Sequence, residues 1–394
     1  MNESKLQQLY NKMCFTSVFI GVMQKQLLKA FSAFVCAKEN EEKRRAYAAF
    51  VSLVYENGGS LTKLLQQEIA EDENVYIKSA ARGEKVPACM EKAIKTELAL
   101  FSEFAALKPA DFALEMGVLG TEIPAFDSVN ADMGAFYRKR IKNISRYGYG
   151  IFSSRGMFRL SDEKQIEPIV SADKIGMDTF IGYEEEREKV VANTRAFVEG
   201  RPAANTLLCG DAGTGKSSTV KAVANAFFDE GVRLIELRKD QLSLLPYVMG
   251  KISGNPLKFI IFIDDLAFNR SDDNFSMLKA ALEGSASAKA ENAVIYATSN
   301  RRHIIKESFS DRDGDDVHRN DTLQETLSLS ERFGLVVLFS KPDKKLYLEI
   351  VHELAKTHGV QMEQAELDVQ AEAFALRKGN RSARCAEQFI DSLS

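Results

Sequence analysis

The residues whose types and spacing most clearly predict chemistry form one short run in the second half of the chain. They satisfy the pattern G-x-x-x-x-G-K-[ST] and are Gly210, Asp211, Ala212, Gly213, Thr214, Gly215, Lys216 and Ser217, with Ser218 directly after them. Glycines in such a run let main-chain N–H groups surround a phosphate, and a helix that begins there directs its positive N-terminus at the same anion. We therefore expect a phosphate-binding loop, in which Lys216 reaches the β- and γ-phosphates of a nucleotide and Ser217 ligates magnesium.

A pair of acids at the end of an apolar run is the second chemical feature. Residues 259–263 are all large and apolar, and Asp264 and Asp265 follow them. We expect Asp264 to hold magnesium, directly or through water, and Asp265 to polarise the attacking water. One aspartate is sufficient for the metal, so a helix-capping role for Asp265 stays open.

The elements that must position these residues follow from the hydrophobic periodicity. Beyond Asp178, short apolar runs alternate with helical patterns, which indicates a parallel sheet with helices on both faces. Most of the runs are nearly continuous in apolarity, as in strands that are buried on both sides. The predicted strands are residues 205–209, 233–237, 259–263, 293–297 and 335–339. The phosphate loop then lies between the first strand and a helix from Ser217 to about Phe228.

The rest of the chain divides by pattern. At 394 residues the chain is long enough for two or three domains. Helical periodicity predicts a mainly helical N-terminal domain over residues 1–132, with helices at 46–55, 61–69 and 93–107. No catalytic constellation is recognisable there. Residues 133–177 are interpreted as a basic and aromatic connector, 178–341 as the α/β core, and 342–394 as a small helical lid.

Composition narrows the class of protein. A formal net charge of -4 gives no global attraction to nucleic acid or membrane, so such a contact would need a local patch. The five cysteines are scattered without a CxxC pair, which favours neither a disulfide framework nor a zinc site and fits a reducing cytoplasm. The apolar stretch at residues 15–23 is too short to span a bilayer and is predicted to be helical. We expect a cytoplasmic protein without membrane contact.

The region from Asp178 to the end resembles the AAA+ superfamily of P-loop ATPases. The resemblance implies a parallel five-stranded sheet between helices, a helical lid, ATP and Mg²⁺ as ligands, ATP hydrolysis, and assembly of a homo-oligomer as a ring or filament. It also implies further site residues. Asn300, which follows the strand at 293–297, resembles the first sensor, and Arg332 in the sequence Leu-Ser-Glu-Arg-Phe-Gly resembles the arginine finger that reaches the neighbouring subunit. Capping and surface roles remain alternatives for these two residues.

Two more segments resemble AAA+ motifs. Residues 379–384 resemble the second sensor of the lid, where Arg384 is favoured and Arg381 is the alternative. Residues 180–184 resemble the segment that packs on adenine, with apolar contacts from Ile181 and main-chain contacts from Gly182. More closely, residues 148–217 resemble a bacterial AAA+ family of unknown function that joins a helical N-terminal region to one AAA+ module. Asp265 departs from the superfamily, where glutamate is usual, and this puts the rate of hydrolysis in doubt.

Three hypotheses remain for what an ATPase of this kind acts on, and all involve a macromolecular partner. Residues 133–161 contain no acid and mix basic with aromatic side chains, which would suit single-stranded nucleic acid; a basic helix followed by a hairpin on the ATPase module is the alternative. Residues 247–250 are Tyr-Val-Met-Gly and resemble the threading loop of an unfoldase, although their spacing also fits a helical core. A weakly hydrolysing nucleotide-dependent switch or scaffold is the third.

Overall fold

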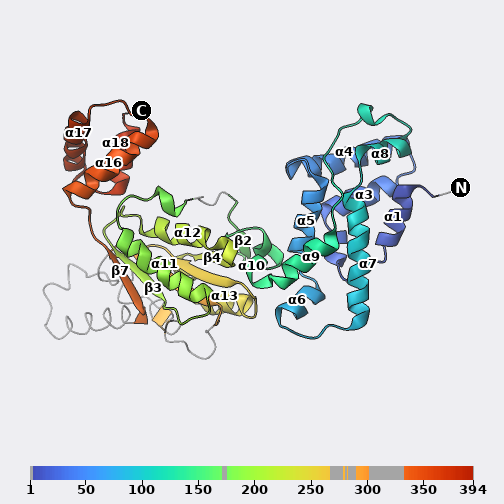
Figure 1. Ribbon diagram of the computed structural model, residues 1–394, viewed down its shortest axis with the longest axis horizontal. Helices are drawn as coiled ribbons and strands as arrows, with labels where there is room; N and C mark the ends of the chain where they lie inside the picture. The colour runs from blue at the N-terminus through green and yellow to red at the C-terminus, as the bar shows by residue number, and fades with distance from the viewer. Residues whose placement is uncertain are drawn as a thin grey trace. The chain divides into compact units, whose positions relative to one another are not determined.

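The computed structural model of the protein describes residues 3–170, 175–266, 278–279, 282, 290–300 and 332–393. The chain forms two compact units, Met1–Ser154 and Arg155–Ser394. Figure 1 shows the first as a helical assembly and the second as a sheet with helices.

The first unit is helical. Its elements are α1 (Lys5–Met13), α2 (Ile20–Met23), α3 (Gln26–Cys36), α4 (Asn40–Glu56), α5 (Leu61–Glu71), α6 (Val75–Ala81), α7 (Ala88–Ala105), α8 (Pro109–Met116), η1 (Gly120–Glu122), α9 (Met133–Lys142), α10 (Ile144–Tyr147) and η2 (Gly150–Ser153). Aromatic rings fill the core at edge-to-face distances. The ring of Phe31 lies 4.9 Å from that of Phe104, and the ring of Phe19 lies 5.1 Å from that of Tyr137. Such pairs add to the stabilisation from burial.

The apolar stretch at residues 15–23 contains only the four-residue helix α2, so the prediction of a longer helix there was wrong. The preceding turn is held by Glu97 from α7, which is buried. Its carboxylate accepts hydrogen bonds of 2.8–3.1 Å from the main-chain N–H groups of Ser17, Val18 and Phe19 and from the Ser17 hydroxyl. A carboxylate that satisfies three N–H donors competes with a helix for them.

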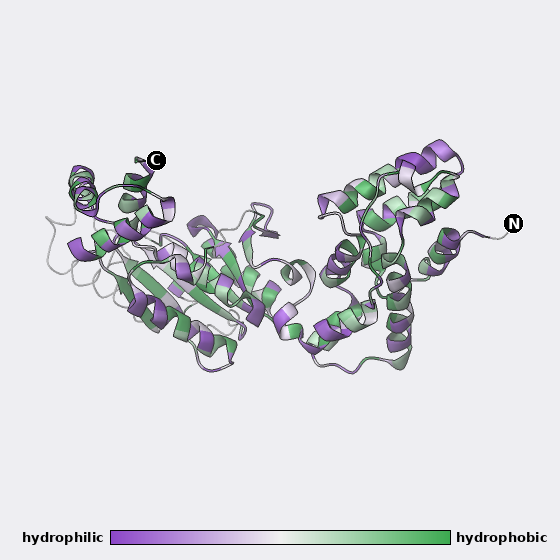
Figure 2. Ribbon diagram, turned by 45° about the horizontal axis from the view of Figure 1, so that its top comes forward, coloured by the Kyte–Doolittle hydropathy of each residue, from purple (hydrophilic) through white to green (hydrophobic). Residues whose placement is uncertain are grey.

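The second unit is built on a seven-stranded sheet with the order β2-β1-β4-β5-β6-β3-β7. Its strands are β1 (Met157–Leu160), β2 (Ile166–Pro168), β3 (Thr206–Gly210), β4 (Val232–Leu237), β5 (Lys258–Ile263), β6 (Ala293–Ser299) and β7 (Leu335–Phe339). All neighbouring strands are parallel except β1 and β2. Figure 2 colours the central strands as hydrophobic, and Ile260, Ile261 and Phe262 are fully buried, as strands covered on both faces require.

Helices flank the sheet and form the lid. They are η3 (Met177–Thr179), α11 (Glu184–Val198), α12 (Lys216–Ala226), η4 (Phe228–Glu230), η5 (Lys239–Leu244), α13 (Leu245–Ile252), α16 (Lys344–His358), α17 (Gln364–Lys378) and α18 (Ala383–Asp391). Side chains from α11 and α12, such as Val190 and Val223, share one buried cluster with Leu208 of β3. The three last helices enclose their own core around Tyr347 and Phe389, which makes the lid a separate small layer.

The strands β4, β5, β6, β3 and β7 are the five that the sequence predicted, and their parallel order with the phosphate loop after β3 is the AAA+ arrangement. The fold is therefore an α/β AAA+ P-loop module with a helical lid, preceded by a helical unit. The sheet also has two strands beyond the predicted five. Strands β1 and β2 come from the stretch interpreted as a connector, and β1 pairs in parallel with β4.

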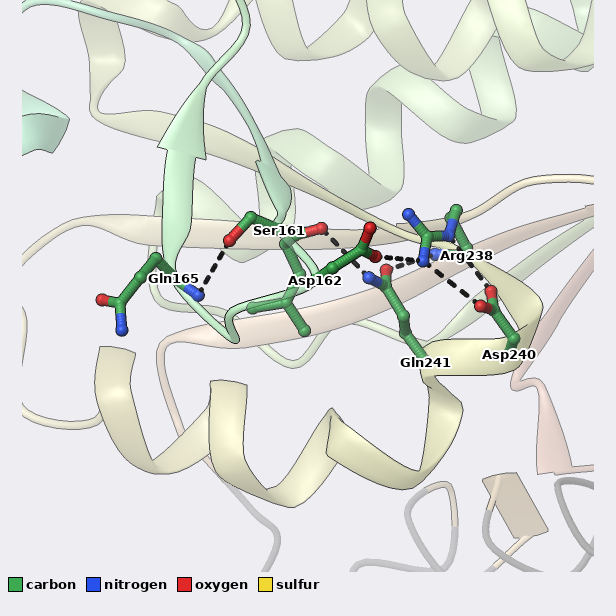
Figure 3. Close-up of polar contacts among 7 residues, drawn as sticks. Ser161, Asp162, Gln165, Arg238, Asp240 and Gln241 are labelled. Atoms are coloured by element: carbon green, nitrogen blue, oxygen red, sulfur yellow. Dashed lines mark hydrogen bonds and ion pairs between the residues drawn. The ribbon is translucent and has the colours of Figure 1, made fainter.

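Polar contacts fix this added hairpin to the end of β4 (Figure 3). The guanidinium of Arg238 donates to Asp162 in the hairpin turn at 2.7 Å and to Asp240 at 3.2 Å. The Gln241 amide donates to the carbonyl of Leu160 at 3.1 Å. The hairpin thus covers the edge that β4 would otherwise expose.

No helix within the described residues is long and apolar enough to span a bilayer.

Candidate active site

The loop between β3 and α12 has the shape that a phosphate site needs. Gly210, Gly213 and Gly215 have φ angles of 134°, 76° and 84°, which side chains other than glycine rarely adopt. Gly210 is the most constrained, because it pairs with Phe339 of β7 and a Cβ there would lie 2.0 Å from the Phe339 carbonyl oxygen. The close pairing of β3 with β7 therefore requires glycine where the loop begins.

Lys216 begins α12 and is almost fully buried. Its ammonium donates to the carbonyl oxygens of Asp211 at 2.6 Å and Gly210 at 3.2 Å. Burial lowers the pKa of Lys216, and the Asp211 carboxylate opposes that shift. The positive charge thus lies inside the curve of the loop, where it would meet a bound phosphate.

Ser217 and Asp264 meet across the carboxyl edge of the sheet. The Ser217 hydroxyl donates to Asp264 Oδ1 at 2.6 Å, and the Thr298 hydroxyl donates to the same oxygen at 2.5 Å. Magnesium takes oxygen ligands and is usually held by one or two protein groups together with substrate phosphates. A serine hydroxyl beside an aspartate fits that preference. Sequence reasoning missed Thr298, although it stands two residues before Asn300 at the end of β6.

Asp265 and Asn300 form the second half of this edge. The Asn300 amide donates to Asp265 Oδ1 at 2.7 Å, and the main-chain N–H of Asp265 donates to the Thr298 hydroxyl at 3.0 Å. Asp265 has a φ of 51°, a left-handed conformation that is uncommon for residues other than glycine. Such strain persists where surrounding contacts impose it and is frequent at functional sites. The exposed Asp265 carboxylate is thus held beside the phosphate loop by two elements.

The segment expected to contact adenine lies between the loop and the lid. The ring of Phe180 faces Gly215, and the buried guanidinium of Arg187 lies 5.0 Å from its centroid. Ile181 packs against the lid core. At Gly182, with a φ of 71°, a Cβ would lie 2.4 Å from Leu346 of α16. The sequence predicted the segment 180–184 with Ile181 and Gly182 as its contacts, and the structure adds the neighbours of this segment, Gly215 beside Phe180 and Leu346 beside Gly182.

The two candidate lid arginines have different surroundings. Arg381 forms a two-point ion pair with Glu372 of α17, at 2.8 and 3.0 Å, so its guanidinium is engaged within the lid. Arg384 is in the first turn of α18, and its Cβ would lie 3.3 Å from a Cβ placed on Gly213 of the phosphate loop. Ser382, which caps α18, also lies against Gly213. Of the two arginines, Arg384 has its Cβ next to the loop.

Arg332 comes just before the start of β7, at the opposite end of the strands from the phosphate loop. It comes shortly before Leu335, which pairs with Thr206 at the start of β3, whereas Phe339 pairs with Gly210 at its end. The rise from Leu335 to Phe339 is about 13 Å at about 3.3 Å per residue. The structure therefore does not bring Arg332 to the loop of its own chain.

The remaining predicted loop residues lie along the same turn. Ala212 is exposed, the Thr214 hydroxyl donates to the Asp211 carbonyl at 2.9 Å, and Ser218 is half-buried in the first turn of α12. The Asp211 carboxylate points to the lid linker, where it accepts the main-chain N–H of Lys341 at 2.9 Å.

The AAA+ module lies within the match to one known family. A family profile described as "Protein of unknown function (DUF815)" matches residues 154–394. The chain belongs to this family. The match contains the whole AAA+ module with its phosphate loop, the acids after β5 and the lid, so DUF815 is the family of unknown function that the sequence resembled. No curated protein matches the chain.

Solved structures resemble the DUF815 module only distantly. The Holliday junction branch migration motor RuvB of Thermotoga maritima is 14% identical, with 55% of this chain and 72% of that chain covered and a TM-score of 0.35. A variant of the same protein is 16% identical at the same coverage and TM-score. At these values the likeness adds nothing to what the strand order itself shows.

The basic and aromatic stretch begins before the DUF815 match, and its rings are mostly core residues. Tyr137 is 1% exposed, and Phe158 is fully buried in β1. The Arg140 guanidinium lies 5.0 Å from the centroid of the Tyr147 ring and donates to the Tyr147 carbonyl. The buried rings of Tyr137 and Phe158 are not available to stack on bases. The other hypothesis for this stretch, a basic helix followed by a hairpin on the module, agrees with α9 and the β1–β2 hairpin.

The segment that resembled a threading loop is part of helix α13. Val248 and Met249 are buried in the core. Tyr247 is partly exposed, and the Lys251 ammonium lies 5.5 Å from its ring centroid. The apolar spacing there is that of a packed helix.

Proposed function

We propose that this DUF815 protein binds ATP with magnesium and hydrolyses it. The observation that carries the proposal is the convergence at one sheet edge of side chains from three elements, the start of α12 and the ends of β5 and β6. A phosphate loop, a serine and aspartate 2.6 Å apart, and a second aspartate that accepts from an asparagine at 2.7 Å all meet there. Each arrangement alone could be structural, but together they supply phosphate binding, metal binding and activation of water.

Each residue has a defined task in such a reaction. Lys216 would offer its ammonium to the β- and γ-phosphates in place of the loop carbonyls. Ser217 and Asp264 would hold magnesium, which when bound neutralises phosphate charge during the transfer. Asp265 would accept a proton from the attacking water or orient it, and Asn300 would fix both that carboxylate and the water. Ile181, Gly182 and Arg384 would enclose the nucleotide from the side of the lid.

Arg332 supports the proposal of a homo-oligomer. Because it precedes the start of β7, whereas its own loop follows the end of the adjacent strand β3, we propose that it serves the nucleotide bound by a neighbouring copy. A planar guanidinium is suited to stabilising the charge that spreads over a transferring phosphoryl group. The complete site would then need two chains.

The first test is steady-state hydrolysis and nucleotide binding by the full chain. Lys216→Ala should abolish nucleotide binding, and Asp265→Asn should keep it while lowering turnover by about 100-fold or more. The matched control is Lys189→Ala, which changes an exposed lysine on α11 outside the site and should hydrolyse ATP at the wild-type rate. Equal turnover by wild type and Asp265→Asn would contradict the assigned base.

The second test mixes inactive variants. Lys216→Ala and Arg332→Ala should each be inactive, but a mixture should regain activity because some sites combine an intact Lys216 with an intact Arg332 of the neighbour. A mixture of Lys216→Ala with Asp265→Asn is the control, since both residues belong to one chain's half of the site. Regain in neither mixture would contradict the action of Arg332 on the nucleotide of a neighbouring copy.

Nucleic acid remains the candidate partner, through phosphate contacts rather than base stacking. In the N-terminal unit, Lys92, Lys95, Arg138 and Lys142 line a groove of about 680 Å³ between α7 and α9. If it binds nucleic acid, Lys95→Ala with Lys142→Ala should weaken the binding of a labelled oligonucleotide and reduce the dependence of its affinity on salt. Lys63→Ala, an exposed lysine on α5, is the control. Unchanged affinity in the double variant would favour a switch that acts on a protein partner.

A further inference from the structure

Asp211, the second residue of the phosphate loop, joins three parts of the module. Its main-chain N–H donates to the Phe339 carbonyl of β7 at 3.1 Å. Its carbonyl accepts the Lys216 ammonium at 2.6 Å. Its carboxylate Oδ2 accepts the main-chain N–H of Lys341 at 2.9 Å. The same residue therefore contacts the phosphate-binding lysine and the linker that leads from β7 into the lid.

An acid at this position needs an explanation. The G-x-x-x-x-G-K-[ST] pattern leaves it free, and a carboxylate beside bound phosphates weakens binding by like-charge repulsion. The contact with Lys341 supplies a reason, because a hydrogen bond to a charged acceptor is about twice as strong as one between neutral groups. The carboxylate is directed at the linker.

The linker that Asp211 holds is short and stiff. Pro342 follows Lys341 and restricts its backbone to extended conformations. Asp343 then caps α16 by accepting the Leu346 N–H at 2.8 Å. On the other side, the Tyr183 hydroxyl donates to the Ser340 carbonyl at 2.5 Å. A displacement of the Lys341 amide would therefore be transmitted directly to the first helix of the lid.

The lid in turn meets the loop again at a second place. Ser382 and Arg384 at the start of α18 lie against Gly213, two residues after Asp211. The lid is thus held to the phosphate loop by a hydrogen bond at its linker and by packing at its last helix. A change in the loop acts on both ends of the lid.

Phosphate binding would change the contacts of Asp211. A phosphate seated in the loop competes with the Asp211 and Gly210 carbonyls for the protons of the Lys216 ammonium. We propose that Asp211 is a positioning residue: when a phosphate binds in the loop, Asp211 shifts the Lys341 amide and so changes the position of the lid. The inference rests on the proposed nucleotide binding and adds to it the path by which the lid responds.

Hydrogen exchange of the full chain measures this contact directly. Without nucleotide, Asp211→Ala should speed exchange of the Lys341 amide about tenfold or more, as expected for loss of a hydrogen bond to a charged group. Asp211→Asn keeps an acceptor and should retain most of the protection. Lys341→Ala is the control, because the contact uses only its main-chain N–H.

The coupling is tested by adding a non-hydrolysable ATP analogue with magnesium, at concentrations that saturate each variant. In the wild type and in Asp211→Asn, exchange in residues 341–358 should change when the analogue binds. In Asp211→Ala the analogue should bind without that change. Asp211→Leu, which has nearly the shape of aspartate but no acceptor, provides a second variant should the alanine variant fail to fold. Thermal unfolding of each variant shows whether it is folded.

The outcomes separate the two proposals. A lid response in Asp211→Ala or Asp211→Leu equal to that of the wild type would overturn the role of Asp211 and leave nucleotide binding intact. A response lost in these variants and kept in Asp211→Asn would support it, since a merely structural residue would alter protection in both nucleotide states alike. If the wild type binds no nucleotide, the proposed function fails, and the coupling with it.

Discussion

Replacing Gly210 by alanine should lower the free energy of unfolding far more than replacing a glycine with similar backbone strain elsewhere. Gly210 has a φ of 134°, and a Cβ there would lie 2.0 Å from the Phe339 oxygen and 2.7 Å from its carbonyl carbon. Both neighbouring atoms are main chain, so no side chain can rotate away. The strand end must separate from β7 or the loop must deform.

The magnitude can be worked out from these contacts. Backbone strain at such a φ costs about 1–3 kcal/mol. Separation of the strand ends would also break the 3.1 Å hydrogen bond from Asp211 to Phe339, worth about 1 kcal/mol, and disturb packing around the fully buried Phe339. We expect a loss of about 3–5 kcal/mol in the free energy of unfolding. Gly200→Ala is the matched control: its φ is 72° and no atom lies within 4 Å of the added Cβ, so strain alone predicts about 1–2 kcal/mol.

Denaturant unfolding of the two variants, with equal slopes required for comparison, gives both values. Binding of labelled nucleotide should fall in Gly210→Ala and persist in Gly200→Ala. If the two variants lost the same stability within about 0.5 kcal/mol, the close pairing at Phe339 would not be the constraint, and the reasoning would be wrong.

Two further predictions concern the lid and the N-terminal unit. Arg384→Ala should reduce nucleotide affinity or turnover with little change in the free energy of unfolding. Arg381→Ala should mainly destabilise the lid, because it leaves the Glu372 carboxylate without its two-point ion pair. Nucleotide titration and thermal unfolding of both variants check this. Burial raises the pKa of Glu68 in α5 to about 8. The folded state therefore holds a proton that the unfolded chain loses, and stability should fall by roughly 4 kcal/mol between about pH 5 and about pH 9. Urea unfolding of Glu68→Gln should lack most of that fall.

The sheet could be predicted closely because most of its strands are nearly continuous runs of apolar residues. The predicted run 259–263 is β5 without its first residue, and 335–339 coincides with β7. Continuous apolarity is a local signal, so a single sequence is enough to see it. Strand β2 was missed because its three residues include Pro168 and Glu167, and its place in the sheet depends on the distant Arg238.

The site residues also include some that the sequence predicts and some that only the structure brings together. Lys216, Ser217 and the two aspartates follow from spacing next to a strand. Thr298 and the Lys341 amide carry no motif, and their contacts with Asp264 and Asp211 appear only when separate elements meet. The basic stretch shows what composition leaves open: it allowed both a stacking surface and a basic helix followed by a hairpin, and the structure places Tyr137 and Phe158 in hydrophobic cores. Composition reports which side chains are present, and burial decides which of them a ligand could reach.

The register of β3 and β7 leads to a conclusion about assembly. Because Gly210 pairs with Phe339 and Thr206 pairs with Leu335, the loop and Arg332 are at opposite ends of adjacent parallel strands. This pairing holds the start of β7 about 13 Å from the loop, at about 3.3 Å per residue over four residues. An arginine finger at Arg332 therefore requires a second copy, and hydrolysis per chain should rise with protein concentration until the assembly is complete. A rate per chain that stayed constant on dilution to the monomer would mean that Arg332 has another role.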